Sequence, residues 1–379
     1  MPNQISKLII SLLASANFLG SSSFAGQVPE FFRSRTGDVG KVISSVKKGS
    51  VRLEAVSPGG RPVYSVSYGE MEPYVRTANF VSAALSGHPE AFARRAEGAR
   101  PVLMVIAGVH GHELETVVGA LNLIRIMETG KDFRGRAWDE ISEKAARYRL
   151  VIIPCANPDG RERVPKNSFV GLPADTMTYY GQGTRADGTM FRWPWVKEYH
   201  PMVGGNVGFL GGYFNDQGVN IQCDDMFFPM AEETKAILRL AKLEAPDLVV
   251  NVHSHEERGE FLISSFVPPA MRARNKEIAD RYLEVMKKEG VPPCHFTREL
   301  KDAQGFWAMD LTDALYHVSG AMPVTFEGPH GCSDSLAYRI DYDGILDTHL
   351  IMYRELLRIG LEPGGFRGKP GVPRGNWKE

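Results

Sequence analysis

The chain has 379 residues, of which 43% are hydrophobic and 23% are charged, so it can bury a large core in one or two domains. Its 44 Lys and Arg residues nearly balance its 45 Asp and Glu residues, and the formal net charge is -1. No long basic run with interleaved aromatic residues is present, which argues against nucleic acid as a partner.

The first 25 residues are typical of an export signal. Lys7 precedes an apolar stretch at residues 8–20, and Ser23, Phe24 and Ala25 form a small-x-small cleavage site. A short membrane anchor or a buried helix is the alternative, but this stretch is too short to span a bilayer, and no later segment is apolar enough. We therefore expect a secreted or periplasmic protein without stable membrane insertion after the signal is removed.

Strands and helices alternate along the rest of the chain. We expect strands at residues 51–56, 62–69, 102–107, 150–154 and 247–252, and one that ends at Glu327. We expect helices after residue 113 and at residues 232–243, 270–289 and 345–359. This pattern predicts an α/β fold with helices on the faces of a sheet.

Two segments lack this regular pattern. Residues 161–220 are rich in Gly, Pro, Tyr and Trp, which is typical of a functional loop system inside a domain. The segment 361–379 is rich in Gly, Pro and basic residues and is expected to be a disordered tail.

The most informative motif follows the expected strand at residues 102–107. The apolar run stops at Gly108 and is followed by His110, Gly111, His112 and Glu113, which predicts a turn and the start of a helix. Ligands of open α/β sheets bind at this edge of the sheet. Imidazole nitrogens and carboxylate oxygens suit Zn²⁺, so the motif predicts a third ligand and a general base at the ends of other strands.

Both expected residues occur downstream. The sequence PDLVVNVHSHEE forms an apolar strand that ends at His253, and AMPVTFEGPHG forms one that ends at Glu327. A carboxylate at Glu327 can take a proton from the attacking water and pass it to a leaving amine. His112 with Glu115 is the alternative to His110 with Glu113, and His255 is the alternative to His253.

Four ordered motifs make the chain resemble the zinc carboxypeptidases, the carboxypeptidase A/B-like metallopeptidases. They are H-x-x-E after a buried strand, NPDG at residues 157–160, the strand ending at His253, and TFEG at residues 325–328. The resemblance covers about residues 60–360 and implies one zinc ion per chain, held by His110, Glu113 and His253, with Glu327 as general base and acid. It also implies that residues 26–360 form a single catalytic domain, with a three-layer α/β/α fold and a mixed, mostly parallel sheet of about eight strands.

The resemblance is incomplete where the substrate would bind. In the family a G-V-D-L-N-R segment supplies an Asn and an Arg that clamp the terminal carboxylate of the substrate. Residues 218–225 read GVNIQCDD here, so Gln222 and Cys223 stand in those places. Asp224 and Asp225 would favour a cationic substrate group, or they cap a following turn or helix. Gln222 and Asp224 are therefore candidate substrate-binding residues.

The NPDG motif supplies three further candidates. Asn157 and Arg161 are candidate substrate-binding residues, and Arg163 is a candidate catalytic residue. Arg161 and Arg163 can polarise the scissile carbonyl as the family's oxyanion arginine does. Solvated loop arginines are the alternative interpretation.

The four cysteines do not predict a metal site. Cys155, Cys223, Cys294 and Cys332 lack CxxC spacing, and they form either two disulfides or free thiols.

The predicted function is that of an exported zinc metallocarboxypeptidase-like hydrolase, which cleaves peptide bonds in peptides or peptide-like substrates with a water that zinc activates. One alternative is a deacylase of the aspartoacylase and succinylglutamate desuccinylase type, which is similar in fold and zinc set but cleaves N-acyl amino acids. A non-catalytic binding protein on the same fold is the other. The complete set of ligands and the base Glu327 argue against the binding protein.

Overall fold

The computed structural model describes residues 27–367, apart from residues 74–75, 78–92, 95–97, 194, 198, 227, 256–259, 265, 292–297, 300–308 and 335–338. The expected signal and Cys294 lie outside the described residues. Cys155 is a buried free thiol, so the four cysteines do not pair into two disulfides.

One eight-stranded sheet has the strand order β1-β2-β6-β5-β9-β12-β10-β11. The strands are β1 (Ser50–Val56), β2 (Pro62–Tyr68), β5 (Val102–Ile106), β6 (Arg149–Ile153), β9 (Leu248–His255), β10 (Glu260–Ile263), β11 (Arg298–Glu299) and β12 (Met322–Pro329). The adjacent strands β6, β5, β9 and β12 are parallel, and β10 is parallel to β11. The pairs β1·β2, β2·β6 and β10·β12 are antiparallel. The predicted mixed, mostly parallel sheet of about eight strands is confirmed.

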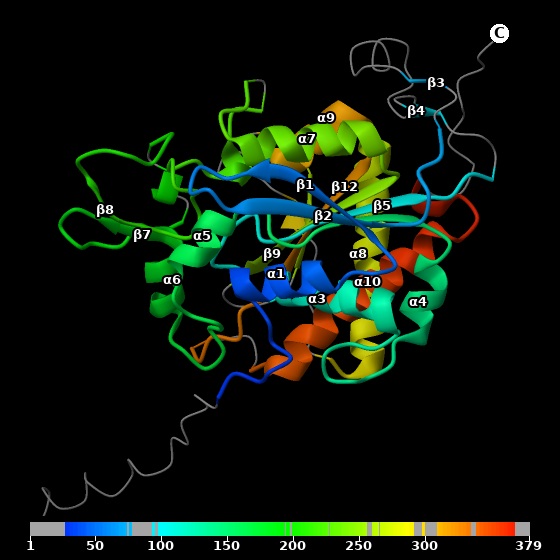
Figure 1. Ribbon diagram of the computed structural model, residues 1–379, viewed down its shortest axis with the longest axis horizontal. Coiled ribbons are helices and arrows are strands. Elements are labelled where there is room, and N and C mark those ends of the chain that lie inside the picture. Colours follow the sequence, from blue (N-terminus) through cyan, green and yellow to red (C-terminus); the bar gives the residue numbers. More distant parts are fainter. Residues whose placement is uncertain are drawn as a thin grey trace, which may run out of the picture.

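Helices cover both faces of this sheet (Figure 1). On one face lie α1 (Thr36–Ser45), α3 (Leu114–Thr129), α4 (Asp139–Ala145), α8 (Pro269–Glu289) and α10 (Tyr342–Gly360), and on the other lie α7 (Glu232–Glu244) and α9 (Leu311–Ser319). The side chains of the central strands alternate between the two cores, because successive residues of a strand point to opposite faces. In β5, for example, Leu103 and Val105 pack with the larger group of helices, whereas Met104 and Ile106 pack with α7 and α9. The chain therefore has the three layers that the sequence predicts.

Short elements occupy the stretch that was expected to be irregular. They are α5 (Pro158–Arg163), α6 (Ala174–Gln182), β7 (Gly183–Arg185), η1 (Trp195–Lys197), β8 (Val207–Leu210) and η2 (Ile221–Cys223). The strands β7 and β8 form a separate antiparallel hairpin at the side of the molecule (Figure 1). A second small pair joins β3 (Arg76–Thr77) to β4 (Ala93–Arg94). These pieces are too short to show a hydrophobic period, which is why the sequence indicated only a loop system.

The structure describes the first part of the segment that was expected to be a tail. Residues 361–367 are described and include the helical turn η3 (Gly365–Arg367). Phe366 is buried and its ring lies 6.3 Å from that of Tyr148, so this apolar side chain attaches the segment to the core. Within the described part of the chain, no helix has both the length and the apolar character that crossing a membrane requires.

Candidate metal centre

Glycines allow the turn after β5 to present polar side chains at the edge of the sheet. All five residues of β5 are buried, and Gly108 then adopts a φ of +64°, a left-handed conformation that favours glycine. At Gly111 the backbone of α5 approaches so closely that an added Cβ would lie 2.0 Å from the Arg161 nitrogen. His110 lies between these two glycines, and Glu113 directly precedes α3.

Three side chains from this turn and from β9 converge on one point. His110 Nδ1 lies 2.5 Å from Glu113 Oε1, and His253 Nδ1 lies 2.9 Å from Glu113 Oε2. The two Nδ1 atoms are 3.2 Å apart, and the ligand atoms of the three residues all lie within 4.8 Å of one another. All three residues are buried, with 2–6% of their surface exposed. We call them the first metal set.

The chemistry of the first metal set fits a divalent cation. Two imidazole nitrogens and a carboxylate face one another in a buried space, and they match the donor types that zinc prefers. Burial alone would raise the pKa of Glu113, but the neighbouring His110 and His253 hold it well below its usual range, so the carboxylate is ionised. Burial opposes protonation of His253, yet the Glu113 charge raises the pKa of this ring to about 8. A cation at the same point would replace that proton.

Two residues that sequence reasoning missed hold His110 in place. Asn220 is buried, and its Oδ1 lies 3.2 Å from His110 Nε2, where it can accept a hydrogen bond. That bond keeps the proton on Nε2, so the lone pair of Nδ1 points toward Glu113 and His253, where a metal would bind. The ring of Tyr213 packs against the other side of the imidazole, with ring centroids 4.1 Å apart. Asn220 belongs to the GVNIQCDD segment, which could have identified it, but nothing in the sequence marked Tyr213.

Glu327 lies beside the first metal set. In the parallel pair of β12 and β9, Glu327 is directly opposite His253. Residues in register on adjacent strands share one face of the sheet, so both side chains are on the face that carries the metal set. Glu327 is half-buried. Its charge also acts on His253, where it contributes to the raised pKa of the ring.

The two arginines after NPDG are bound within the surrounding loops. Each guanidinium nitrogen of Arg161 donates to a backbone carbonyl, those of Ser34, Val164 and Lys166, and only 2% of the residue is exposed. Burial lowers the pKa of Arg161 to about 10. These contacts give Arg161 a structural role instead of the predicted substrate contact.

Arg163 also serves a loop. It donates to the carbonyls of Gly211 and Phe214, each at 2.9 Å, and pairs with Asp216. These contacts fix the loop that carries Tyr213, so Arg163 acts on the first metal set through that ring.

Asn157 caps α5 and contacts the same loop. Its Oδ1 accepts a hydrogen bond from the Gly160 nitrogen at 2.8 Å, and its Nδ2 donates to the Tyr213 carbonyl at 3.5 Å. The residue is fully buried, so these contacts replace the substrate contact that was predicted for it.

Asp224 has a capping role. It accepts hydrogen bonds from the Ala231 nitrogen at 3.1 Å and from Thr234 Oγ1 at 2.6 Å, both at the start of α7. The structure thus supports the capping interpretation, and the contact with a cationic substrate group stays a prediction.

Gln222 belongs to a hydrogen-bonded network under the first metal set that also includes the carboxyl group of Asp310. Gln222 accepts from Asn251 Nδ2 at 2.7 Å, and both side chains contact Thr312. Asn251 is two residues before His253 on β9, so it lies on the same face of the sheet. Gln222 therefore remains the one predicted substrate-binding residue that the structure brings close to the ligands.

The other histidine and glutamate of the turn do not join the first metal set. His112 and Glu115 are buried beside it, and the ring of His112 lies 6.0 Å from that of His110. His255 is two residues beyond His253 at the end of β9. Among the described residues, the ligand atoms that gather are those of His110, Glu113 and His253.

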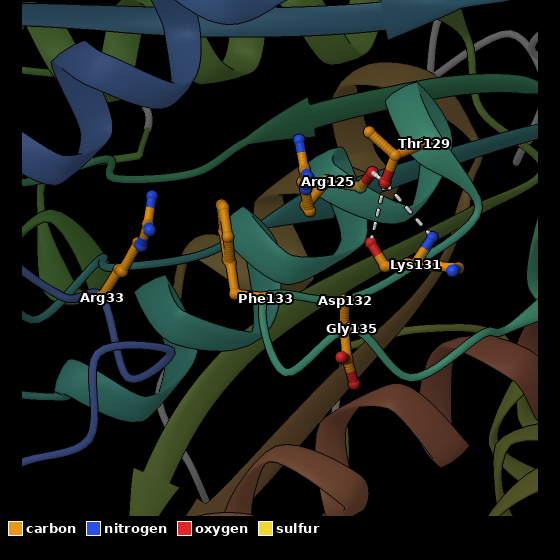
Figure 2. A pocket seen from close by; sticks show the side chains of 7 residues that line it. All are labelled: Arg33, Arg125, Thr129, Lys131, Asp132, Phe133 and Gly135. Atoms are coloured by element: carbon orange, nitrogen blue, oxygen red, sulfur yellow. Dashed lines mark hydrogen bonds between the residues drawn. The ribbon is translucent and has the colours of Figure 1, made fainter.

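A pocket of about 330 Å³ lies away from the metal centre (Figure 2). Its lining is rich in cations and consists of Arg33, Arg125, Thr129, Lys131, Asp132, Phe133 and Gly135. The pocket is at the C-terminal end of α3, whereas Glu113 precedes its N-terminal end. A helix of 16 residues is about 24 Å long, so this pocket is not part of the metal centre.

Comparisons with known proteins point to one family. Residues 47–344 match the family model of the zinc carboxypeptidases. No curated protein has a sequence that matches this chain significantly.

Solved structures with a similar fold include three carboxypeptidase-related proteins. A metallo-carboxypeptidase from Burkholderia cenocepacia has a TM-score of 0.50 and 16% identity. The match covers 84% of this chain and 66% of the Burkholderia chain, so this chain spans slightly less than two thirds of that protein's length. Bovine thrombin-activatable fibrinolysis inhibitor, solved with a tick carboxypeptidase inhibitor, has a TM-score of 0.54 and 12% identity, and the match covers 87% of this chain and 98% of the bovine chain. Carboxypeptidase A from Helicoverpa armigera has a TM-score of 0.50 and 14% identity, and the match covers 89% of this chain and 75% of the Helicoverpa chain. At these identities the likeness shows the fold alone.

Proposed function

Because this chain belongs to the zinc carboxypeptidase family, we propose that it is an exported zinc-dependent hydrolase that cleaves peptide bonds in peptides or peptide-like substrates. The observation that carries the proposal is the convergence of His110, Glu113 and His253 within 4.8 Å, with Glu327 directly opposite His253 on the neighbouring strand. A set of three metal ligands with a separate carboxylate beside it is what metal-assisted hydrolysis requires.

Each residue of the site has a separate role in the proposed reaction. His110, Glu113 and His253 would hold the ion, which when bound polarises the scissile carbonyl and lowers the pKa of water. Glu327 takes the proton of the attacking water and returns it to the leaving amine. Asn220 and Tyr213 keep the His110 ring oriented so that its Nδ1 faces the ion.

The identity of the substrate depends on the groups around Gln222. The Gln222 side chain is a neutral amide that contacts Asn251 and Thr312, and Cys223 follows it in the chain. An amide can donate to a carboxylate or to a carbonyl, but it lacks the charge and the two-pronged geometry of a guanidinium. We therefore propose that the enzyme does not require a free terminal carboxylate as strictly as an arginine clamp would impose.

The test of the function compares zinc content and turnover in wild type and in Glu327→Gln. The variant should keep the metal content of the wild type and lose about 10²–10⁴-fold in turnover, since it lacks the base. Glu355→Gln is a matched control, because Glu355 is a buried carboxylate in α10 that pairs with Arg354 and Arg358. Full turnover in Glu327→Gln would overturn the mechanism.

A substrate panel then separates peptidase from deacylase. It contains peptides with free and with amidated carboxyl ends, peptides that include diaminopimelate, and N-acyl amino acids. Cleavage of free and amidated peptides alike agrees with the role of Gln222, whereas cleavage of N-acyl amino acids alone would assign the deacylase activity instead.

A further inference from the structure

The pocket at the C-terminal end of α3 gathers three cationic side chains from separate parts of the chain (Figure 2). Arg33 comes from the segment before α1, Arg125 from α3 and Lys131 from the turn that follows α3. The volume of about 330 Å³ is at the lower end of the range for small-molecule sites. Arg125 and Lys131 are exposed, so the pocket is open to solutes. Its lining is therefore suited to a small anionic ligand.

The ring of Phe133 holds two of these cations near one another. The guanidinium carbon of Arg33 lies 4.0 Å from the ring centroid, and that of Arg125 lies 5.7 Å from it. Figure 2 shows the ring between the two arginines. Such a contact orients a guanidinium without neutralising its charge. The two like charges repel each other, and a bound anion would relieve that repulsion.

The turn that carries Phe133 is fixed before any ligand binds. The Phe133 nitrogen donates to Oδ1 of the buried Asn122 at 2.9 Å. Asp132 Oδ1 accepts from the Arg134 nitrogen at 2.9 Å. A ligand therefore meets a pocket whose backbone is already ordered, which lowers the entropic cost of binding.

The carboxylates of this region are engaged elsewhere. The side chain of Asp132 is 0% exposed, pairs with Arg134 at 2.8 Å and accepts from Trp138 Nε1 at 3.0 Å. Figure 2 shows its carboxylate directed away from the two pocket arginines. Glu128, in the last turn of α3, accepts from the backbone nitrogens of residues 47–49. Neither group is positioned to neutralise the pocket.

One carboxylate pairs with a pocket cation in the described part of the chain. Glu30 Oε1 lies 3.4 Å from Arg33 Nη2, and the Glu30 side chain is 94% exposed. Such an exposed pair is weak, so an anion in the pocket can displace it. The charged groups of Arg125 and Lys131 have no ion pair among the described residues.

We propose that this pocket binds the phosphate group of a small molecule. A guanidinium presents N–H groups in a fork that matches phosphate oxygens, and a lysine adds a point charge. Three cations from different elements suit a tetrahedral group, with oxygens on several sides, better than a planar carboxylate. The pocket is separate from the metal centre, so the inference goes beyond the proposed function and does not depend on it.

Calorimetric titration of the zinc-loaded full chain with glycerol 3-phosphate, at constant ionic strength, tests the proposal. The wild type should bind one molecule per chain. Arg125→Gln and Lys131→Gln should each bind about 10–100-fold more weakly, because each variant removes hydrogen bonds from a charged donor. Lys41→Gln is the matched control, because Lys41 is exposed in α1 and does not line the pocket. This control loses the same charge and should bind like the wild type.

A second arm identifies the source of the phosphate. Wild type and Arg125→Gln are sedimented with phosphatidylcholine vesicles that contain or lack phosphatidic acid. Sedimentation of the wild type alone, and only with phosphatidic acid, would support the site and assign it to a lipid headgroup. Binding of glycerol 3-phosphate without sedimentation would support the site and assign it to a soluble phosphate ester.

Three results would overturn the proposal, and none of them bears on turnover, which Glu327→Gln tests. The first is no binding by the wild type, or equal affinities in the wild type and both pocket variants. The second is binding that both pocket variants retain but Glu113→Gln loses, which would place the anion at the metal centre. The third is binding of malonate, a dicarboxylate, as tightly as glycerol 3-phosphate, which would refute the assignment to phosphate.

Discussion

Replacing Glu233 with Gln should change how the stability of the protein depends on pH. Glu233 is fully buried in the first turn of α7, and its carboxylate accepts hydrogen bonds from Asn215 Nδ2 at 3.3 and 3.4 Å. Burial is the main cause that raises the pKa of Glu233 from 4.5 to about 7; the charges of Asp159 and Asp224 contribute to this rise, and the hydrogen bonds from the helix backbone and from Asn215 oppose it. The folded protein therefore holds a proton here that the unfolded chain has released.

The magnitude follows from that difference in pKa. A change from 4.5 to about 7 corresponds to about 3 kcal/mol of free energy of unfolding. Because the folded pKa is the higher one, this stability is fully present below pH 4.5 and is lost as the pH rises through about 7. Glutamine keeps the size and the acceptor oxygen but has no proton to lose. The variant should therefore gain about 3 kcal/mol relative to the wild type between pH 4.5 and pH 8.

The assay is urea unfolding of wild type and variant at several values of pH from 4.5 to 8. Glu232→Gln is the matched control, because Glu232 is the preceding residue of the same helix and its side chain is 64% exposed. The difference between Glu233→Gln and wild type should grow with pH, and it should grow more than the difference between Glu232→Gln and wild type. Parallel curves for Glu233→Gln and wild type would refute the reasoning.

Three further predictions concern the metal centre and its supports. Removal of zinc with a chelator should lower the melting temperature by several degrees, and added zinc should restore it. The reason is that an ion bound only by the folded state, at 100 times its Kd, contributes about 2.7 kcal/mol to the free energy of unfolding. Scanning calorimetry measures the melting temperature, and an unchanged value would contradict the prediction. Asn220→Ala should weaken zinc binding about 10–100-fold, because it removes the oxygen that accepts from His110 Nε2, whereas Asn220→Asp should retain the affinity. Competition with a chromogenic chelator measures both affinities. Equal affinities for the alanine variant and the wild type would argue against the role of Asn220. Gly111→Ala should destabilise the protein by about 1–3 kcal/mol, because the new methyl group would collide with the backbone of α5. Gly40→Ala in α1 is the control. Its methyl group meets nothing within 4 Å, so the variant should leave the stability unchanged or raise it by about 1 kcal/mol.

The convergence of His110, Glu113 and His253 could be predicted because these residues lie at or just after the ends of buried strands. The apolar runs before His110, His253 and Glu327 mark β5, β9 and β12, and parallel neighbours in a sheet bring their carboxyl ends to one edge. The same hydrophobic patterns located the long helices α3, α7, α8 and α10 to within a few residues.

The supports of the site could not be predicted in this way. Tyr213 and Asn220 reach His110 through a loop whose course is set by Arg163, Asn157 and several close glycine contacts, none of which has a periodic pattern. Arg161 has the residue type of a substrate contact, and only its three backbone acceptors reveal a structural role.

The most direct test of the central claim is the location of zinc by anomalous diffraction at the zinc edge, in crystals of the zinc-loaded protein. The account predicts a strong peak bounded by His110 Nδ1, the Glu113 carboxylate and His253 Nδ1, at about 2.0–2.2 Å from each ligand atom. The absence of a peak at the first metal set, in crystals whose zinc content has been measured, would contradict the account.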